Sequence, residues 1–102
     1  MVFPLARFRV EDQSMEPMLR SGDYVLVNRW AYRSHLPAAG DIVVLRDPEA
    51  TGQFLVKRIM SSDATAGFFV LGDNMAHSRD SRHFGMVPRH LLIGKVRYHA
   101  KP

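Results

Sequence analysis

The sequence contains no cysteine, and no apolar run comes near the roughly 20 residues that a membrane-spanning helix needs. Without cysteine, disulfide bonds and thiolate metal sites are excluded. The first ten residues, MVFPLARFRV, carry Arg7 and Arg9 within their apolar stretch, which excludes a secretory signal peptide. We therefore expect a chain without a membrane span, located in the cytoplasm.

Lysine is also scarce: eleven of the fourteen basic residues are arginine, and only Lys57, Lys95 and Lys101 are lysine. The formal net charge is +4, but the basic residues are scattered, and the densest group, SRDSRH, includes an aspartate. A solvated basic surface therefore explains the charge better than a nucleic-acid-binding patch. A length of 102 residues fits one domain, residues 1–102, with a small core.

Helix signals are weak, whereas short runs of β-branched and aromatic residues, bounded by Gly, Asp, Pro or Ser, recur along the chain. These runs predict strands at 5–10, 24–30, 41–47, 53–60, 67–71 and 92–99. Short helical turns are expected at 16–21 and 88–92, with Pro88 in a first helical position. The pattern predicts a mostly β fold, a compact coiled β-barrel or sandwich with one or two short helical turns.

The stretch DQSMEPMLRSGD places Ser14 before a turn and an apolar strand. A serine hydroxyl becomes a nucleophile when a neighbouring base takes its proton. Histidine is the usual base, but the five histidines lack an accompanying G-x-S-x-G motif, and their spacing does not fit a metal site. We therefore expect no metal and no cofactor, and we ask which other residue could activate Ser14.

Lys57 is the other candidate base. A lysine is normally protonated at pH 7, because its pKa is about 10.4, but burial in apolar surroundings lowers that pKa. In the run QFLVKRIM, strand alternation places Leu55 and Ile59 on the same face as Lys57. From this strand alone, a lysine at a sheet edge with a solvated amine is the simpler interpretation. The polar cluster in LGDNMAHSRDSRHFG, residues 71–85, changes the balance, because its serines could hold a buried amine without adding charge.

Together these segments resemble the signal peptidase I family, peptidase S26, of Ser/Lys proteases. SMEPML resembles the nucleophile motif of the family, SGDYVLV the strand after it, VKRI the Lys-Arg motif, and GDNMAHSRDSRHFGMVP the last conserved motif. Each motif is short, but four of them in the order of the family, from Ser14 to Pro88, seldom arise by chance. The resemblance implies a coiled β fold with a shallow cleft that binds its substrate as an extended strand.

The resemblance assigns chemical roles to the residues that match. Ser14 would be the nucleophile and Lys57 the neutral general base. Ser78 would hydrogen-bond and orient the Lys57 amine, and Gly72 would leave room for it. The Ser14 N–H would contribute to the oxyanion hole.

Other matching residues would shape the site. Met15 and Pro17 would form the loop that presents Ser14, and Met15 could touch the substrate cleft. Two further matching residues, Asp73 and Asn74, belong to the turn after a strand and would also shape the site. Asp80 and Arg82, joined by Arg58, would form a salt-bridged brace.

The chain departs from the family pattern beside the nucleophile. Family members often carry Ser or Gly two residues before it, where a hydroxyl can help to bind the oxyanion, whereas this chain has Asp12 followed by Gln13. An ionised Asp12 aimed at the oxyanion would oppose catalysis, so we expect its carboxylate to point away and an amide or a water to be the second donor. Met18 and Ser21 replace the usual threonine and arginine, and both changes are expected to be tolerated.

Thirteen residues precede Ser14, and no insertion of domain size separates Lys57 from Gly72. In this respect the chain resembles the short, anchorless branch of the family that matures nickel superoxide dismutase. The expected function is therefore removal of an N-terminal leader or pro-segment from a precursor protein in the bacterial cytoplasm. Nickel superoxide dismutase is the expected substrate, and the metal would belong to it.

Three alternatives stay open. The chain could be a signal peptidase I that removes secretory signal peptides, with its membrane anchor outside this sequence. It could be a LexA-type self-cleaving domain, although thirteen upstream residues leave no room for a cleavage site and a DNA-binding segment. Outside the enzymes, it could be a basic β-barrel that stacks nucleotides on the aromatic residues Trp30, Tyr32, Phe68 and Phe69.

Overall fold

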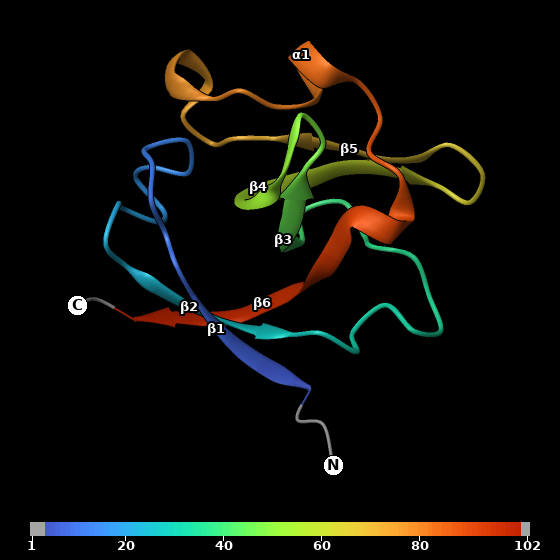
Figure 1. Cartoon of the computed structure of the whole chain (residues 1–102), viewed down its shortest axis with the longest axis horizontal. Coiled ribbons are helices and arrows are strands. Elements are labelled where there is room, and N and C mark those ends of the chain that lie inside the picture. The colour runs from blue at the N-terminus through green and yellow to red at the C-terminus, as the bar shows by residue number, and fades with distance from the viewer. Residues whose placement is uncertain (1–3, 101–102) are drawn as a thin grey trace.

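The computed structural model describes residues 4–100, whose six strands pair antiparallel in one sheet, in the order β1-β2-β6-β3-β4-β5 (Figure 1). The strands are β1 (Leu5–Arg9), β2 (Tyr24–Asn28), β3 (Ile42–Asp47), β4 (Ala50–Asp63), β5 (Gly67–Leu71) and β6 (Leu92–Ala100). Three short helical elements lie between β5 and β6: η1 (Met75–His77), α1 (Ser81–Phe84) and η2 (Arg89–Leu91). None of the helices in residues 4–100 is long and apolar enough to cross a membrane.

The predicted mostly β fold is confirmed, and each expected strand forms, with β4 longer and β2 shorter than expected. The segment expected to turn at 16–21 forms hydrogen-bonded turns but no assigned helix, and its Leu19 N–H donates to the Met15 carbonyl at 2.9 Å. The turn expected at 88–92 forms as η2, but Pro88 is its N-cap rather than its first helical residue. The elements η1 and α1 lie in the polar cluster of residues 71–85, for which no helix was expected.

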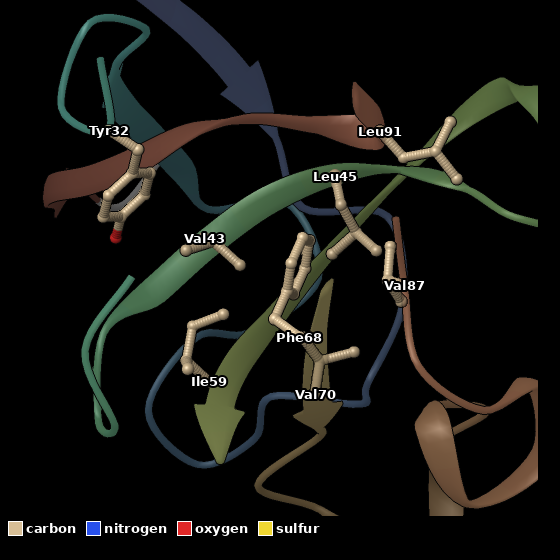
Figure 2. Packing of buried hydrophobic residues seen from close by; sticks show 8 residues of the cluster. All are labelled: Tyr32, Val43, Leu45, Ile59, Phe68, Val70, Val87 and Leu91. Carbon is tan, nitrogen blue, oxygen red and sulfur yellow. The ribbon is translucent and has the colours of Figure 1, made fainter. Parts of the chain in front are cut away.

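The central strand β3 is buried on both faces, because the coiled sheet has a core cluster on each side of it. Val43 and Leu45 belong to the first cluster, and Val44 between them belongs to the second. Figure 2 shows the first cluster, in which the Phe68 ring is surrounded by aliphatic side chains. The buried residues of the second cluster are Val10, Met15, Leu19, Val25, Val27 and Val44. This second cluster fixes the loop that carries Ser14 to the sheet.

Two of the four aromatic residues that were considered as a nucleotide-stacking surface, Phe68 and Tyr32, are buried in the first core cluster. Phe68 is 1% exposed and Tyr32 is 8% exposed. Trp30 is 40% exposed, but the Arg33 guanidinium covers its ring at 4.2 Å from the centroid. These positions disfavour the nucleic-acid-binding alternative, whose direct test is the salt dependence of binding.

Register shifts in four of the five strand pairs coil the sheet. Within the described residues, β1 pairs with β2 alone, and β4 pairs with β5 only from Arg58 onward. One edge of β1 and one edge of the first half of β4 therefore stay unpaired. The segment that contains α1, coloured orange in Figure 1, lies beyond β5 on the side away from β1 and β2.

Candidate active site

Ser14 lies in the loop between β1 and β2, where its neighbours anchor it to the second core cluster. Ser14 is only 2% exposed, and Met15 and Leu19 are fully buried. The Glu16–Pro17 peptide bond of this loop is cis. Buried apolar anchors on the C-terminal side of Ser14 thus hold the serine in place.

Met15 does not reach a cleft, contrary to expectation, because its side chain is packed into the core. Its Sδ accepts a hydrogen bond from the Asp73 N–H at 3.5 Å. The Asn74 N–H donates to the Ser14 carbonyl at 2.8 Å, and the Asn74 amide Nδ2 donates to the Gln13 carbonyl at 3.1 Å. The turn after β5 is therefore bonded directly to the loop that carries Ser14.

Lys57 lies in the middle of β4, and its side chain is buried, with the residue 1% exposed. Ile59, on the same face, is also buried, as strand alternation predicts. The Lys57 Nζ donates a hydrogen bond to the Ser78 Oγ at 3.2 Å. Lys57 is therefore not the solvated edge lysine that the strand alone suggested.

Burial lowers the pKa of Lys57 below its ordinary value, because the charged ammonium loses its hydration. Several charged groups nearby modify this effect. The carboxylates of Asp12, Asp80 and Asp47 favour the ammonium, whereas the guanidinium of Arg79 opposes it. The net shift is downward, in the direction that a general base requires.

Ser78 links the amine to a buried carboxylate. Its hydroxyl donates to the Asp80 Oδ2 at 2.7 Å, so its oxygen lone pairs are available to accept from Lys57. Asp80 is fully buried and also accepts from the Gly72 N–H at 2.9 Å and from the Arg82 Nε at 2.9 Å. Burial alone would raise the pKa of Asp80, but its hydrogen bonds with Arg82, Gly72 and Ser78 hold that pKa well below its usual range. An ionised Asp80 can only accept, so it fixes the direction of the Ser78 hydroxyl.

Gly72 lies where two segments of the site come closest. A Cβ at this position would collide with the Ser78 Oγ and would lie 2.6 Å from the Ser14 carbonyl oxygen. The sequence predicted that Gly72 makes room for the Lys57 amine, whereas the nearest atoms belong to Ser78 and Ser14. The missing side chain lets the Ser14 loop approach the segment that carries Ser78.

Of the three residues expected to form a salt-bridged brace, Asp80 and Arg82 pair with each other, whereas Arg58 does not join them. Arg82 pairs with Asp80, with the Nε 2.9 Å from the Oδ1. Arg58 instead pairs with Asp73 through two hydrogen bonds of 2.8 Å. Because Arg58 follows Lys57 on β4, its pair with Asp73 ties the turn after β5 to the strand that carries the amine.

The Asp12 carboxylate points at Ser14, contrary to the expectation that it points away. Its Oδ1 accepts from the Ser14 N–H at 3.1 Å and from the Ser14 hydroxyl at 2.9 Å. In the described part of the chain, no hydrogen bond joins Ser14 to Lys57. The expectation failed because an aspartate readily bonds the backbone two residues further on, which makes this turn favourable locally.

Sequence reasoning missed Asp47 and Arg79. The Arg79 guanidinium forms ion pairs with Asp47, which is 1% exposed, and with Glu49. Asp47 ends β3, and Arg79 lies between Ser78 and Asp80, so the pair ties the segment that carries Ser78 to β3. Asp47 and Arg79 are 32 residues apart in the sequence, and no local pattern marks a pair at that separation.

A groove of about 600 Å³ lies between the segment that leads to Ser14 and the first half of β4. Its lining includes six consecutive residues, 7–12, and four residues of β4, 53–56. The rings of Phe8 and Phe54 contact each other across it, with centroids 5.1 Å apart. Asp12 also lines the groove, which therefore extends to the neighbourhood of Ser14.

Among residues 4–100, no three His, Cys, Asp or Glu side chains gather as metal ligands. The expectation that no cofactor takes part stays a prediction.

The signal peptidase, peptidase S26, family model matches residues 1–67 and 64–100. The chain is 33% identical to mitochondrial ATP-independent inner membrane protease subunit 1b of Arabidopsis thaliana, over 87% of this chain and 66% of that protein. It is 33% identical to mitochondrial inner membrane protease subunit 2 of Danio rerio, over 86% of this chain and 60% of that protein. It is 25% identical to probable signal peptidase I-1 of Synechocystis sp., over 91% of this chain and 69% of that protein.

The chain spans only 60% to 66% of the length of the first two of these relatives. The family match, by contrast, covers almost the whole chain, including the segments that carry Ser14, Lys57 and Ser78. The chain therefore belongs to the signal peptidase family, peptidase S26.

Proposed function

We propose that this chain is a serine endopeptidase in which Ser14 is the nucleophile and Lys57 the general base. The observation that carries the proposal is the Lys57 amine, which is buried, donates to Ser78 and has a lowered pKa. A buried lysine of lowered pKa close to a serine is the arrangement that nucleophilic catalysis by a Ser/Lys pair requires. Membership of peptidase S26 supports the same reaction.

In the proposed reaction, neutral Lys57 takes the proton of the Ser14 hydroxyl while the Ser14 oxygen attacks the carbonyl carbon of the scissile peptide bond. Lys57 then gives this proton to the leaving amine, and a water molecule hydrolyses the acyl-enzyme. Ser78 accepts from one N–H of the amine, and in the proposed reaction the nitrogen lone pair of the neutral amine takes the Ser14 proton. The Ser14 N–H is the proposed oxyanion donor, a contribution of about 2.7–4 kcal/mol for each donor in other enzymes.

The two unpaired strand edges support a mode of substrate binding. One edge of β1 and one edge of the first half of β4 are unpaired, and residues of both strands line the groove. A peptide in extended conformation could pair with either edge, and backbone hydrogen bonds would then provide affinity. The groove lining includes Asp12, so the scissile bond of such a peptide would lie close to Ser14.

The proposed substrate is a precursor protein that loses its N-terminal leader or pro-segment. The precursor of nickel superoxide dismutase, the substrate expected in the sequence analysis, stays a proposal, and it would require a cytoplasmic location in a bacterium. The names of the relatives, mitochondrial inner membrane proteases and a signal peptidase, instead favour precursors with a secretory or mitochondrial leader. We propose leader removal as the reaction and the nickel superoxide dismutase precursor as the first substrate to test.

The experiment incubates the purified chain with three precursors: a nickel superoxide dismutase precursor, a secretory precursor and a mitochondrial precursor. Intact mass spectrometry of the products reports the bond that is cut. Ser14→Ala and Lys57→Met are run beside the wild type, since each removes one proposed catalytic group. Cleavage at one bond, abolished in both variants, supports the function and identifies the substrate class. Cleavage that survives Ser14→Ala would contradict the assignment of the nucleophile.

A further inference from the structure

The Asp12 Oδ1 accepts hydrogen bonds from the two groups of Ser14 that the proposed reaction uses, its hydroxyl and its backbone N–H. The Ser14 hydroxyl donates its one proton to this oxygen at 2.9 Å, so the proton does not face the Lys57 amine. The Ser14 N–H donates to the same oxygen at 3.1 Å, so the proposed oxyanion donor is also occupied. A substrate carbonyl oxygen that accepts from this N–H must take the place of the Asp12 carboxylate.

We propose that Asp12 is a displaceable latch, which closes the Ser14 site in the free enzyme and moves aside when a peptide fills the groove. This inference rests on the proposed endopeptidase function. Hydrogen bonds to an ionised acceptor are stronger than those between neutral groups, so a neutral peptide carbonyl does not displace Asp12 unaided. The pairing of a peptide strand with the groove edges supplies the rest of the free energy, and the site opens for bound peptide.

The surroundings of Asp12 allow it to move. Asp12 is exposed and lines the groove that the peptide would enter. Within residues 4–100, its carboxylate makes no hydrogen bond or ion pair other than the two to Ser14. Rotation of one side chain therefore frees Ser14, without any change in the buried anchors Met15 and Leu19.

Asp12 also acts on Lys57 through its charge. The charged groups that line the groove with Asp12 are Arg7, Arg9, Glu11, Asp47 and Arg79. Lys57 itself is influenced by Asp12, Asp80, Asp47 and Arg79, and the negative charge of Asp12 favours the ammonium form. Removing this charge lowers the pKa of Lys57 further, so more of the base is neutral at a given pH.

Two substitutions separate the hydrogen bonds from the charge. Asp12→Asn removes the charge but keeps an oxygen that can accept from Ser14, whereas Asp12→Ala removes both. In the profile of kcat/KM against pH, both variants should reach their plateau at a lower pH than the wild type. The plateau of Asp12→Ala should also lie about fivefold above that of Asp12→Asn, which corresponds to the net loss of one ordinary hydrogen bond. Asp63→Asn, a matched loss of charge at the end of β4, should leave the profile unchanged.

A plateau for Asp12→Ala at or below that of Asp12→Asn would overturn the latch, because it would show that the Asp12 side chain assists the reaction. Hydrogen exchange of the Ser14 amide, followed by NMR, gives a readout that does not depend on activity. This amide should exchange about fivefold faster in Asp12→Ala than in Asp12→Asn, and equal rates would overturn the latch. If no precursor is cleaved by any variant, the proposed function fails, and the exchange rates alone decide whether Asp12 closes the site.

Discussion

The amine of Lys57 and the hydroxyl of Ser78 lie 3.2 Å apart inside the protein, and the Ser78 hydroxyl proton is donated to Asp80. Because Asp80 takes that proton, the Ser78 oxygen can accept from Lys57 but not donate to it. The buried amine thus has a hydrogen-bond partner that brings no charge of its own to the site. This relationship between Lys57 and Ser78 is the physical basis of the proposed neutral base.

Ser78→Ala should remove the orientation of the amine while leaving Ser14 and Lys57 in place. We expect kcat/KM to fall by about 10- to 100-fold, at or below the lower end of what a general base contributes. The free energy of unfolding should fall by about 1–3 kcal/mol, because the buried amine loses its acceptor. Steady-state kinetics and urea unfolding measure the two effects. Ser61→Ala, an exposed serine of β4, is the matched control, and an unchanged kcat/KM for Ser78→Ala would contradict the orienting role.

Lys57→Met should abolish cleavage and yet stabilise the fold at neutral pH. Burial lowers the pKa of Lys57 in the folded protein below the value of about 10.4 in the unfolded chain. The unfolded state therefore binds more protons between these two pKa values, and the stability of the wild type rises with pH across that window. The methionine side chain does not titrate, so Lys57→Met lacks this pH dependence. Its free energy of unfolding should exceed that of the wild type by the full amount below the pKa of Lys57 in the folded protein. The difference should vanish as the pH rises past the pKa of Lys57 in the unfolded chain.

Urea unfolding of the wild type and Lys57→Met at pH 7 and pH 10 measures this difference directly. Lys95→Met controls for the loss of a lysine side chain, since the Lys95 side chain is 38% exposed. If the excess stability of Lys57→Met over the wild type does not shrink with rising pH, better packing of methionine explains it, and the cost of burying a charged amine does not.

Gly72→Ala should inactivate the enzyme by separating two segments of the site. The new methyl group would collide with the Ser78 Oγ and press on the Ser14 carbonyl. We expect a destabilisation of about 1–3 kcal/mol, typical of overpacking, and a loss of activity larger than this alone would cause. Gly52→Ala is the matched control, because a Cβ at Gly52 would meet no atom within 4 Å apart from those of its chain neighbours. Full activity of Gly72→Ala at an unchanged melting temperature would refute the close approach.

Most of the strands could be predicted from the sequence, because runs such as YVLVN and IVVLRD alternate or bury their side chains as strands do. The helix α1 had a local signal that was overlooked. Asp80 is its N-cap and forms a capping box with His83, and aspartate is a preferred N-cap residue. The segment 16–21 forms turns that do not continue as a helix, and the Met15 and Leu19 side chains of this region are buried in the core.

The site was only partly within reach of sequence reasoning. The motif order brought Ser14, Lys57 and Ser78 forward. Lys57 bonds to Ser78, and the Ser14 carbonyl and the Ser78 hydroxyl both lie against Gly72. The sequence could not pair Arg58 with Asp73 or Arg79 with Asp47, because those partners meet only through the coiling of the sheet. The direction of the Asp12 carboxylate had a local signal, since an aspartate readily accepts from the backbone N–H two residues further on.

The proposed strand pairing in the groove predicts a pattern of sensitivity along the substrate backbone. In an extended strand, alternate N–H groups face the same neighbouring edge. N-methylation of single residues on the N-terminal side of the scissile bond should therefore raise KM at alternate positions. We expect about a fivefold rise for each lost hydrogen bond. A series of singly N-methylated peptides checks this, and equal effects at every position would contradict pairing with a strand edge.

The dependence of kcat/KM on pH for the wild type tests whether Lys57 is the base that activates Ser14, with Lys57→Met as the reference for lost activity. The free-enzyme pKa of the base appears in this profile. We expect kcat/KM to rise with pH to a midpoint clearly below the ordinary lysine pKa of about 10.4, because burial lowers the pKa of Lys57. A midpoint near 10.4, or substantial cleavage by Lys57→Met, would contradict a buried neutral Lys57 as the base that activates Ser14.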